Sequence, residues 1–427
     1  MIYAFLFIFK VALWGVLTLI VQTDSLAIDL NYGIYSGFEN TTDPIYSHRN
    51  TLPVVEDDRL VSGLNLGVNS SWDSGTISVD AESRNSSYTY NEQLNDTSNQ
   101  LHFQLRQGIR KDKVIFYIND DLQLIKDDIT EPASISNEEE VQRLEYGLEA
   151  NFNINSRNLF KLTGSESAID FQNDSLSNTN SNDLNVSYQY IASKHLNIEF
   201  TRSDTVTRFS EQMISDTERE YISKFVALNY NDSLTNMAVG AGEAGFSSAA
   251  AREPDVSITR FFLERGLTPR FSASINYSKQ LINNSVAILE DFISVSRVGG
   301  SVEERVELNI VYRNNDVLRL FARNIERDEI NTENNATLVD YGFSYETIVG
   351  YSRLRLDYKL QNTNSYQNNA LQFKLYETTQ SVTFESRIRR NTLLSVYYES
   401  RESEERVIKS EIADNRFGIR LSYVVGQ

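Results

Sequence analysis

The feature that most constrains the fold of this chain is an alternation of apolar and polar residues that recurs from end to end. Segments 28–34, 146–154, 306–312, 354–360 and 417–423 place an apolar or aromatic residue at every second position. A period of two is that of a β-strand, whose successive side chains point to opposite faces. The pattern therefore predicts an all-β chain. Its segments approach the ~9–11 residues that a tilted strand needs to cross a membrane.

The connections between these segments alternate in length. Short turns are predicted at 72–75, 155–158 and 313–316, and long polar stretches at 39–57 and 120–140. Short turns at one rim and long loops at the other are typical of bacterial outer-membrane barrels. The sequence thus predicts a transmembrane antiparallel up-and-down β-barrel of about 20 strands, within a range of 18 to 22, with short periplasmic turns and long extracellular loops.

A soluble sandwich or propeller also has many short strands at regular spacing. Two observations favour the membrane barrel. Gly 19 and Pro 5 are few for so many tight turns of a soluble β-protein. Tyr188, Tyr190, Tyr277, Tyr312 and Tyr423 stand near segment ends, where the aromatic girdles of a membrane barrel lie.

Composition excludes several other classes. Only 40% of the residues are hydrophobic, which argues against a helical membrane protein but suits a barrel with a polar lumen. The formal net charge of -19 repels nucleic-acid backbones, so nucleic acid is not an expected partner. Cysteine is absent, which fits an oxidising compartment.

The N-terminus carries an export signal. Residues 11–21 form an apolar run, and Ser25-Leu26-Ala27 follows with small residues where signal peptidase needs them. We therefore assign 1–27 as a signal peptide and 28–427 as the barrel. An uncleaved anchor helix over 2–21 is the alternative. The expected location is the cell outer membrane, among its lipid and lipopolysaccharide, and the oligomeric state stays open.

Residues that alternate with the apolar positions are expected to line the lumen. Early strands contribute acidic side chains and late strands contribute arginines, so an acidic wall is predicted to face an arginine-rich wall, as in porins that select solutes by charge. The alternative is that these charges merely pair with their neighbours. The predicted lumen residues are Asp80, Glu82, Glu145, Glu149, Glu199, Arg305, Arg319, Arg323, Arg353, Arg355, Arg387, Arg389 and Arg420.

No pattern in the chain predicts catalytic, cofactor or metal chemistry. The three histidines are His48, His102 and His195, and His102 is the only one expected inside the lumen. Walker, HExxH, EF-hand and Cys/His metal motifs are absent from the sequence. We therefore expect no cofactor, no metal and no enzyme activity. Residues 281–298 are unusually apolar for a loop, and either a constriction loop folded inward or a strand extension would explain them.

The C-terminal segment 416–423 resembles the assembly signal of outer-membrane barrels, with Arg416, Gly418, Leu421 and Tyr423 at the matching positions. That resemblance implies recognition of the last strand by the barrel-assembly machinery through β-augmentation. The chain departs from the usual pattern because four residues follow Tyr423.

The whole plan resembles outer-membrane barrels of exopolysaccharide and PEP-CTERM/exosortase loci, which share the signal peptide, the Tyr- and Asn-rich strands and the long polar loops. This resemblance implies a pore for small polar solutes, a saccharide or an exopolysaccharide. Two alternatives remain from the residues alone. One is a non-conducting structural or adhesive barrel whose loops bind partners, and the other is a barrel enzyme acting on lipid or surface polymer.

Overall fold

The computed structural model describes residues 27–42, 56–72, 74–90, 95–109, 113–126, 138–171, 178–209, 218–248, 255–283, 300–330, 333–367, 370–407 and 410–425. These residues form one 20-stranded antiparallel sheet. Its strands are β1 (Ala27–Thr41), β2 (Asp57–Trp72), β3 (Gly75–Tyr88), β4 (Asp96–Ile109), β5 (Val114–Lys126), β6 (Glu138–Asn155), β7 (Asn158–Phe171), β8 (Thr179–Ile191), β9 (Leu196–Phe209), β10 (Glu218–Asn231), β11 (Thr235–Ser248), β12 (Val256–Thr268), β13 (Phe271–Asn283), β14 (Gly300–Arg313), β15 (Asp316–Glu329), β16 (Asn335–Val349), β17 (Ser352–Gln367), β18 (Ala370–Arg389), β19 (Thr392–Glu405) and β20 (Ser410–Val425).

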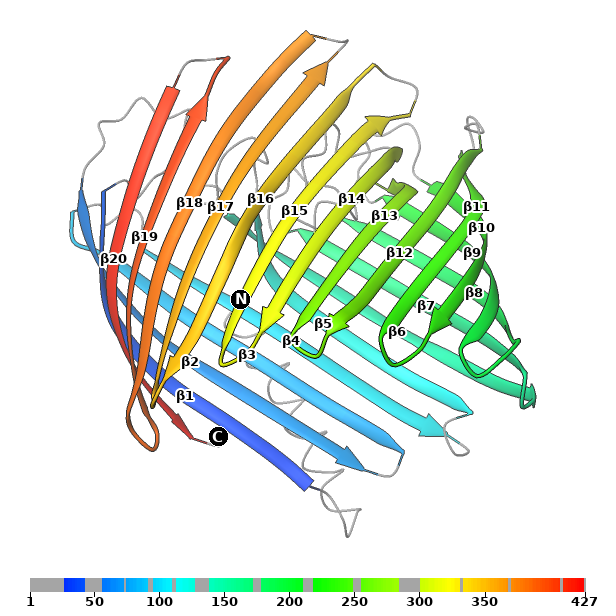
Figure 1. The fold of residues 1–427 in the computed structure, drawn as a ribbon, viewed down its shortest axis with the longest axis horizontal. Helices are drawn as coiled ribbons and strands as arrows, with labels where there is room; N and C mark the ends of the chain where they lie inside the picture. Colours follow the sequence, from blue (N-terminus) through cyan, green and yellow to red (C-terminus); the bar gives the residue numbers. More distant parts are fainter. Residues whose placement is uncertain are drawn as a thin grey trace.

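The sheet closes on itself (Figure 1). Each strand pairs with its neighbours in sequence, and β1 pairs with β20 from Tyr32↔Val425 to Thr41↔Arg416. Closure leaves no strand edge unpaired, which is the condition for crossing a membrane with strands. The predicted fold class and strand number are confirmed.

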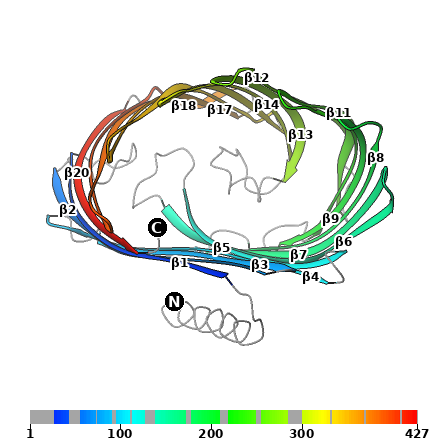
Figure 2. The same ribbon diagram turned by 60° about the horizontal axis from the view of Figure 1, so that its bottom comes forward.

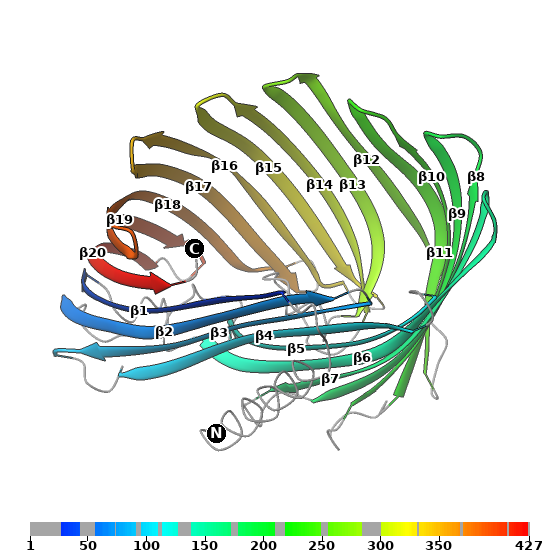
Figure 3. The same cartoon turned by 90° about the horizontal axis from the view of Figure 1, so that it is seen from below.

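The barrel is flattened in cross-section (Figure 2). Strands β1 to β7 form a nearly flat wall, and the later strands form an arch that faces it across the lumen, as Figure 3 shows from below. Strands from the first and last thirds of the chain therefore oppose each other. This arrangement is the one on which the predicted acidic and arginine-rich walls depend.

On most strands, one face carries exposed apolar side chains. On β14, Val306, Leu308 and Tyr312 are 40%, 43% and 40% exposed, and the same face of β20 exposes Phe417 to Tyr423 at every second position. Exposed apolar rows of this kind are unfavourable in water and favourable against lipid chains. They identify the outward face of the barrel, and the intervening residues face the lumen.

The strands extend beyond the predicted segments at the rim opposite the short turns. The predicted loop 120–140 is shortened because β5 continues to Lys126 and β6 begins at Glu138. The predicted loop 39–57 loses its first residues to β1, which ends at Thr41. The physical reason is that backbone pairing continues above the bilayer, where neither face has to be apolar and the alternation disappears.

The short turns lie where the sequence predicts them. The β16–β17 turn places Gly350 at φ 65°, a left-handed conformation that glycine adopts without steric cost. In the β10–β11 turn, Asp232 accepts hydrogen bonds from the backbone N–H groups of Leu234 and Thr235, both at 2.7 Å. Hydrogen bonding lowers the pKa of the Asp232 carboxyl, with the largest contribution from the Tyr230 hydroxyl.

A small apolar core lies where β11 to β14 meet at the outer ends of the strands. Phe246, Ile258 and Leu281 are almost fully buried there, and the Tyr221 ring packs at a tilt against Phe246 with ring centroids 5.3 Å apart. Leu281 belongs to β13, so the apolar segment 281–298 begins as a strand extension. Its residues 284–299, the proposed signal peptide up to residue 26 and His48 lie outside the described residues. Among the described residues, no helix is long and apolar enough to cross a membrane.

Candidate functional site on the inner wall

The cross-strand registers carry the predicted lumen residues onto the face opposite the apolar rows. Asp80 on β3 lies directly across from Gly67 on β2, and Arg353 on β17 lies across from Glu385 on β18. Arg389 alone falls outside this simple alternation, because the β18–β19 pairing shifts register between Arg387 and Arg389 next to the turn.

Several of the predicted arginines of the arch pair with carboxylates. Arg323 makes two hydrogen bonds to Asp340, at 3.1 and 2.6 Å, in a fork-to-carboxylate arrangement. Arg305 pairs with Glu307 at 2.8 Å. Such pairs cancel much of the field that isolated arginines would project into the lumen.

Arg353 and Arg355 are the paired arginines that remain most open to the lumen. Arg353 lies 3.5 Å from Glu346 and 3.8 Å from Glu385, and Arg355 lies 2.8 Å from Asp357. Their side chains are 53% and 51% exposed. Arg319 and Arg387 are exposed on the same wall, and Arg420 lies over the ring of Tyr35, with its guanidinium carbon 4.6 Å from the centroid.

Most predicted acidic residues of the other wall are also satisfied by neighbours. Glu149 contacts Lys161 at 2.9 Å and Arg106 at 3.7 Å. Glu145 accepts a hydrogen bond from the Tyr117 hydroxyl at 3.2 Å, and Glu199 accepts one from the Ser187 hydroxyl at 2.9 Å. Glu145 also lies 3.5 Å from Arg143.

Asp80 and Glu82 differ from Glu145 and Glu149, which lie near lysine or arginine side chains. Within the described chain, neither Asp80 nor Glu82 makes an ion pair with lysine or arginine. Glu82 accepts a hydrogen bond from the Tyr35 hydroxyl at 2.6 Å through one carboxylate oxygen. Among the described residues, the one hydrogen-bond contact of the Asp80 side chain is a long one of 3.5 Å with the Ser78 hydroxyl. These two carboxylates, like Glu199, therefore have no cationic partner among the described residues.

A cavity of about 410 Å³ opens on the flat wall around these two residues. Its lining combines carboxylates with amides and one imidazole, contributed by β1 to β5. The polar side chains in the lining are Asn31, Asn65, Asp80, Glu82, Gln100, His102, Asp121 and Gln123.

His102 forms one edge of the cavity. Its Nδ1 contacts the carboxylate of Asp121, the residue directly across on β5. Among the described residues, no set of three or more His, Asp or Glu side chains is arranged to hold a metal ion. His195 lies away from the cavity, in the β8–β9 turn, where its Nδ1 is 2.8 Å from the carbonyl oxygen of Asn231.

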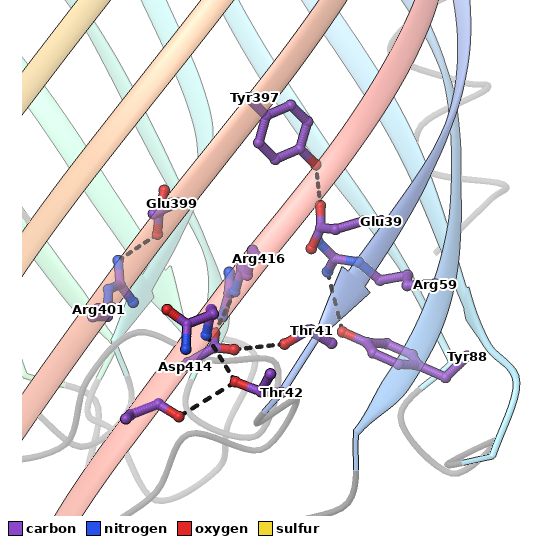
Figure 4. A network of polar contacts seen from close by, with 12 residues as sticks. Glu39, Thr41, Thr42, Arg59, Tyr88, Tyr397, Glu399, Arg401, Asp414 and Arg416 are labelled. Carbon is purple, nitrogen blue, oxygen red and sulfur yellow. Dashed lines mark hydrogen bonds and ion pairs between the residues drawn. The ribbon is translucent and has the colours of Figure 1, made fainter.

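A second polar cluster lies at the seam where the first and last strands meet (Figure 4). Glu39 on β1 binds Arg59 on β2 and Tyr397 on β19, and Arg59 donates to the Tyr88 hydroxyl at 3.1 Å. Glu39 is 4% exposed and Arg59 is 6% exposed. This seam cluster joins strands from both ends of the chain.

The seam cluster continues on β20. The Thr41 hydroxyl donates to Asp414 at 2.8 Å, and Asp414 also pairs with Arg416 (Figure 4). The backbone N–H of Asn415 donates to the Thr42 hydroxyl at 2.8 Å. A chain of hydrogen bonds therefore runs across the seam at the outer end of the closing strand pair.

The residues of the C-terminal signature have distinct places in the closed barrel. Arg416 faces inward in the seam cluster, while Leu421 and Tyr423 are exposed on the outward face. The ring of Tyr397 lies over Gly418, and a Cβ atom built there would stand 2.3 Å from the ring. The glycine therefore makes room for the tyrosine that reaches Glu39.

Sequence reasoning missed most of the cavity and most of the seam. Asp121, Asn31 and Gln123 gave no signal, because amides and aspartates are common on any polar strand face. Glu39 and Tyr397 are 358 residues apart, and only closure of the barrel brings them together. Alternation could place each of these residues on the inner face but not beside its partner.

Comparisons with known proteins agree on the fold. No protein-family model matches the chain, and no curated protein matches it by sequence. Among solved structures, the siderophore receptor PirA from Acinetobacter baumannii is 8% identical, with a TM-score of 0.53 over 94% of this chain and 81% of that one. The FrpB iron transporter (F5-1 variant) from Neisseria meningitidis is 6% identical, with a TM-score of 0.51 over 92% of this chain and 82% of that one. The chain shares the fold of outer-membrane β-barrels, and together with its apolar outward face this places it in the outer membrane of a Gram-negative cell.

Proposed function

We propose that the barrel lets small polar solutes, saccharides among them, pass across the outer membrane. The observation that carries this proposal is the inner face of a closed 20-stranded barrel, which is lined with exposed charged and amide side chains. Strands spaced ~4.8 Å apart and tilted by ~40° give a cylinder roughly 40 Å across for this strand number. Side chains alone fill a barrel of about eight strands, so a much larger one has room for solutes.

The chemistry of the lining supports saccharides as the finer class of solute. Asn, Gln, Asp and Glu side chains offer both donors and acceptors to hydroxyl groups, and the cavity on the flat wall gathers several of them. The exposed arginines of the arch, Arg353 and Arg355, could in addition hold carboxylated sugars through paired hydrogen bonds. Exopolysaccharide is the extended form of the same proposal, because it presents the same groups along a chain.

Single-channel conductance of the refolded protein in a planar bilayer tests the passage of solutes. A steady conductance is expected, and Arg353→Glu with Arg355→Glu should shift ion selectivity towards cations, because both side chains are exposed on the inner wall. The control is Lys224→Glu, an exposed lysine on the outward face of β10, which should leave selectivity unchanged. A correctly folded barrel that never conducts would overturn the proposal.

The contact between His102 and Asp121 makes the enzyme alternative testable, because a carboxylate that orients an imidazole also occurs in hydrolases. We propose that the pair is part of the solute-binding wall and not catalytic. The His102→Ala variant should therefore hydrolyse lipid or polysaccharide at the same background rate as the unmodified protein. A hydrolytic activity that disappears in this variant would establish the enzyme instead.

A further inference from the structure

The cavity on the flat wall has a floor and an uneven charge. Gly67 provides the floor, because a Cβ atom built there would stand 3.1 Å from an Asp80 carboxylate oxygen and 3.5 Å from the Asn31 Cβ. Asp80, Glu82 and Asp121 bring three carboxylates to the lining, and His102 is its single basic side chain. The cavity therefore presents excess negative charge to whatever enters it.

The hydrogen-bonding groups of the cavity are only partly satisfied. The Tyr35 hydroxyl occupies Oε1 of Glu82 and leaves Oε2 without a described partner. The side-chain oxygen of Asn31 is buried and has no hydrogen-bond partner among the described residues. A buried acceptor of this kind is costly unless a donor reaches it. The cavity thus holds acceptor atoms that its own amide donors do not satisfy, and its lining contains no lysine or arginine.

The arginines nearest to the cavity do not neutralise its carboxylates. Arg84 follows Glu82 on the inner face of β3, and Arg420 lies over the ring of Tyr35. Neither makes an ion pair with Asp80 or Glu82 within the described chain. Both arginines lie towards the outer end of the strands relative to Glu82, and the part of the cavity around Asp80, Asn31 and Asn65 has no arginine or lysine in its lining.

We infer that this cavity is a binding subsite for a polar organic cation, a primary amine that also carries hydroxyl groups, as in an amino sugar. An ammonium group supplies three donors and one positive charge, which are what Asp80 and Glu82 lack within the described chain. The hydroxyl groups of the ligand form hydrogen bonds with the side-chain amides of Asn65, Gln100 and Gln123. The inference rests on the proposed function, because a solute reaches the inner wall only through the lumen.

Three hexitol derivatives that differ in charge at one end test the inference. Glucamine carries an ammonium group, sorbitol is neutral and gluconate carries a carboxylate. Isothermal titration calorimetry with the full barrel in detergent micelles should give glucamine an affinity at least about tenfold above that of sorbitol, since one charged hydrogen bond contributes roughly that factor. Gluconate should not bind measurably. Equal binding of all three would overturn the inference.

Variants locate the binding. Asp80→Asn and Glu82→Gln should each weaken glucamine binding about tenfold and leave sorbitol binding unchanged, because they remove charge and keep shape. Gly67→Leu should abolish both by filling the cavity. The matched control is Glu145→Gln, an inner-wall carboxylate outside the cavity that already lies near Arg143. A loss of binding in the control equal to that in Asp80→Asn would overturn the assignment to this cavity.

The calorimetric readout separates this inference from the proposed passage of solutes. A barrel that binds glucamine selectively but never conducts would refute the proposed passage of solutes and support the binding subsite. A barrel that conducts but binds the three hexitol derivatives equally would support the passage of solutes and refute the binding subsite. Folding of each variant is checked by its heat-modifiable mobility in cold gel electrophoresis.

Discussion

Replacing Glu39 by Gln should destabilise the closed barrel more than breaking an exposed ion pair on a strand face. Glu39 and Arg59 are 4% and 6% exposed, and the Glu39 carboxylate also accepts the Tyr397 hydroxyl. Removing one partner leaves Arg59 as an uncompensated buried charge, which costs ~3–5 kcal/mol. At ~1.4 kcal/mol per tenfold change, the unfolding equilibrium constant should rise by roughly two to three and a half powers of ten.

The assay is equilibrium unfolding in urea of the full barrel in phospholipid bilayers, followed by tryptophan fluorescence and by gel mobility. The matched control is Arg208→Gln, which breaks an exposed pair between Arg208 and Glu218, whose side chains are 58% and 53% exposed. Exposed pairs contribute ~0–1 kcal/mol, so this control should hardly move the midpoint.

A double variant separates the buried charge from lost packing. Adding Arg59→Met to Glu39→Gln removes the unpaired buried cation and keeps a side chain of similar length. The double variant should therefore recover part of the lost stability. If Glu39→Gln were no more destabilising than Arg208→Gln, the seam cluster would not stabilise closure, and the reasoning from burial would be refuted.

Three further predictions follow from the two faces and the turns of the barrel. Leu308→Arg should destabilise the barrel by up to ~2–4 kcal/mol in bilayers because Leu308 faces lipid, whereas Asn309→Arg, its inward neighbour, should cost far less; equal losses in urea unfolding would contradict the assignment of faces. The folded pKa of Asp232 is lowered, chiefly by the Tyr230 hydroxyl and then by the N–H groups of Leu234 and Thr235, so the order it gives the β10–β11 turn should be present above the unfolded pKa of ~3.9 and be lost as pH falls through the folded pKa. Amide hydrogen exchange at Leu234 and Thr235 measures this loss, and Asp232→Asn should remove its pH dependence. Gly350→Ala should cost ~1–2 kcal/mol because the turn holds φ at 65°, and Gly350→Asn should cost less; a urea midpoint unchanged in the alanine variant would show that the turn relaxes without cost.

The strands could be predicted because their signal is local. Alternation at 306–312 or 417–423 reflects the two environments of one strand, lipid on one side and lumen on the other, and needs no knowledge of the neighbouring strands. The same argument placed Asp80, Glu82 and Arg353 on the inner face. It failed at the outer strand ends, such as 120–126, because the chain there leaves the bilayer and both faces become polar.

The sequence alone determined that this chain builds a closed β-barrel with an apolar outside, a polar inside and about 20 strands, because a period of two and the turn spacing are properties of neighbouring residues. Only the tertiary structure decided which inner charges neutralise each other and which do not. Arg323 meets Asp340 because β15 and β16 share one register, and Glu39 meets Tyr397 because the barrel closes. Asp80 and Glu82 remain without a cationic partner in the described chain. Pairing depends on register and closure, which relate residues up to the full length of the chain apart, and alternation carries no information on either.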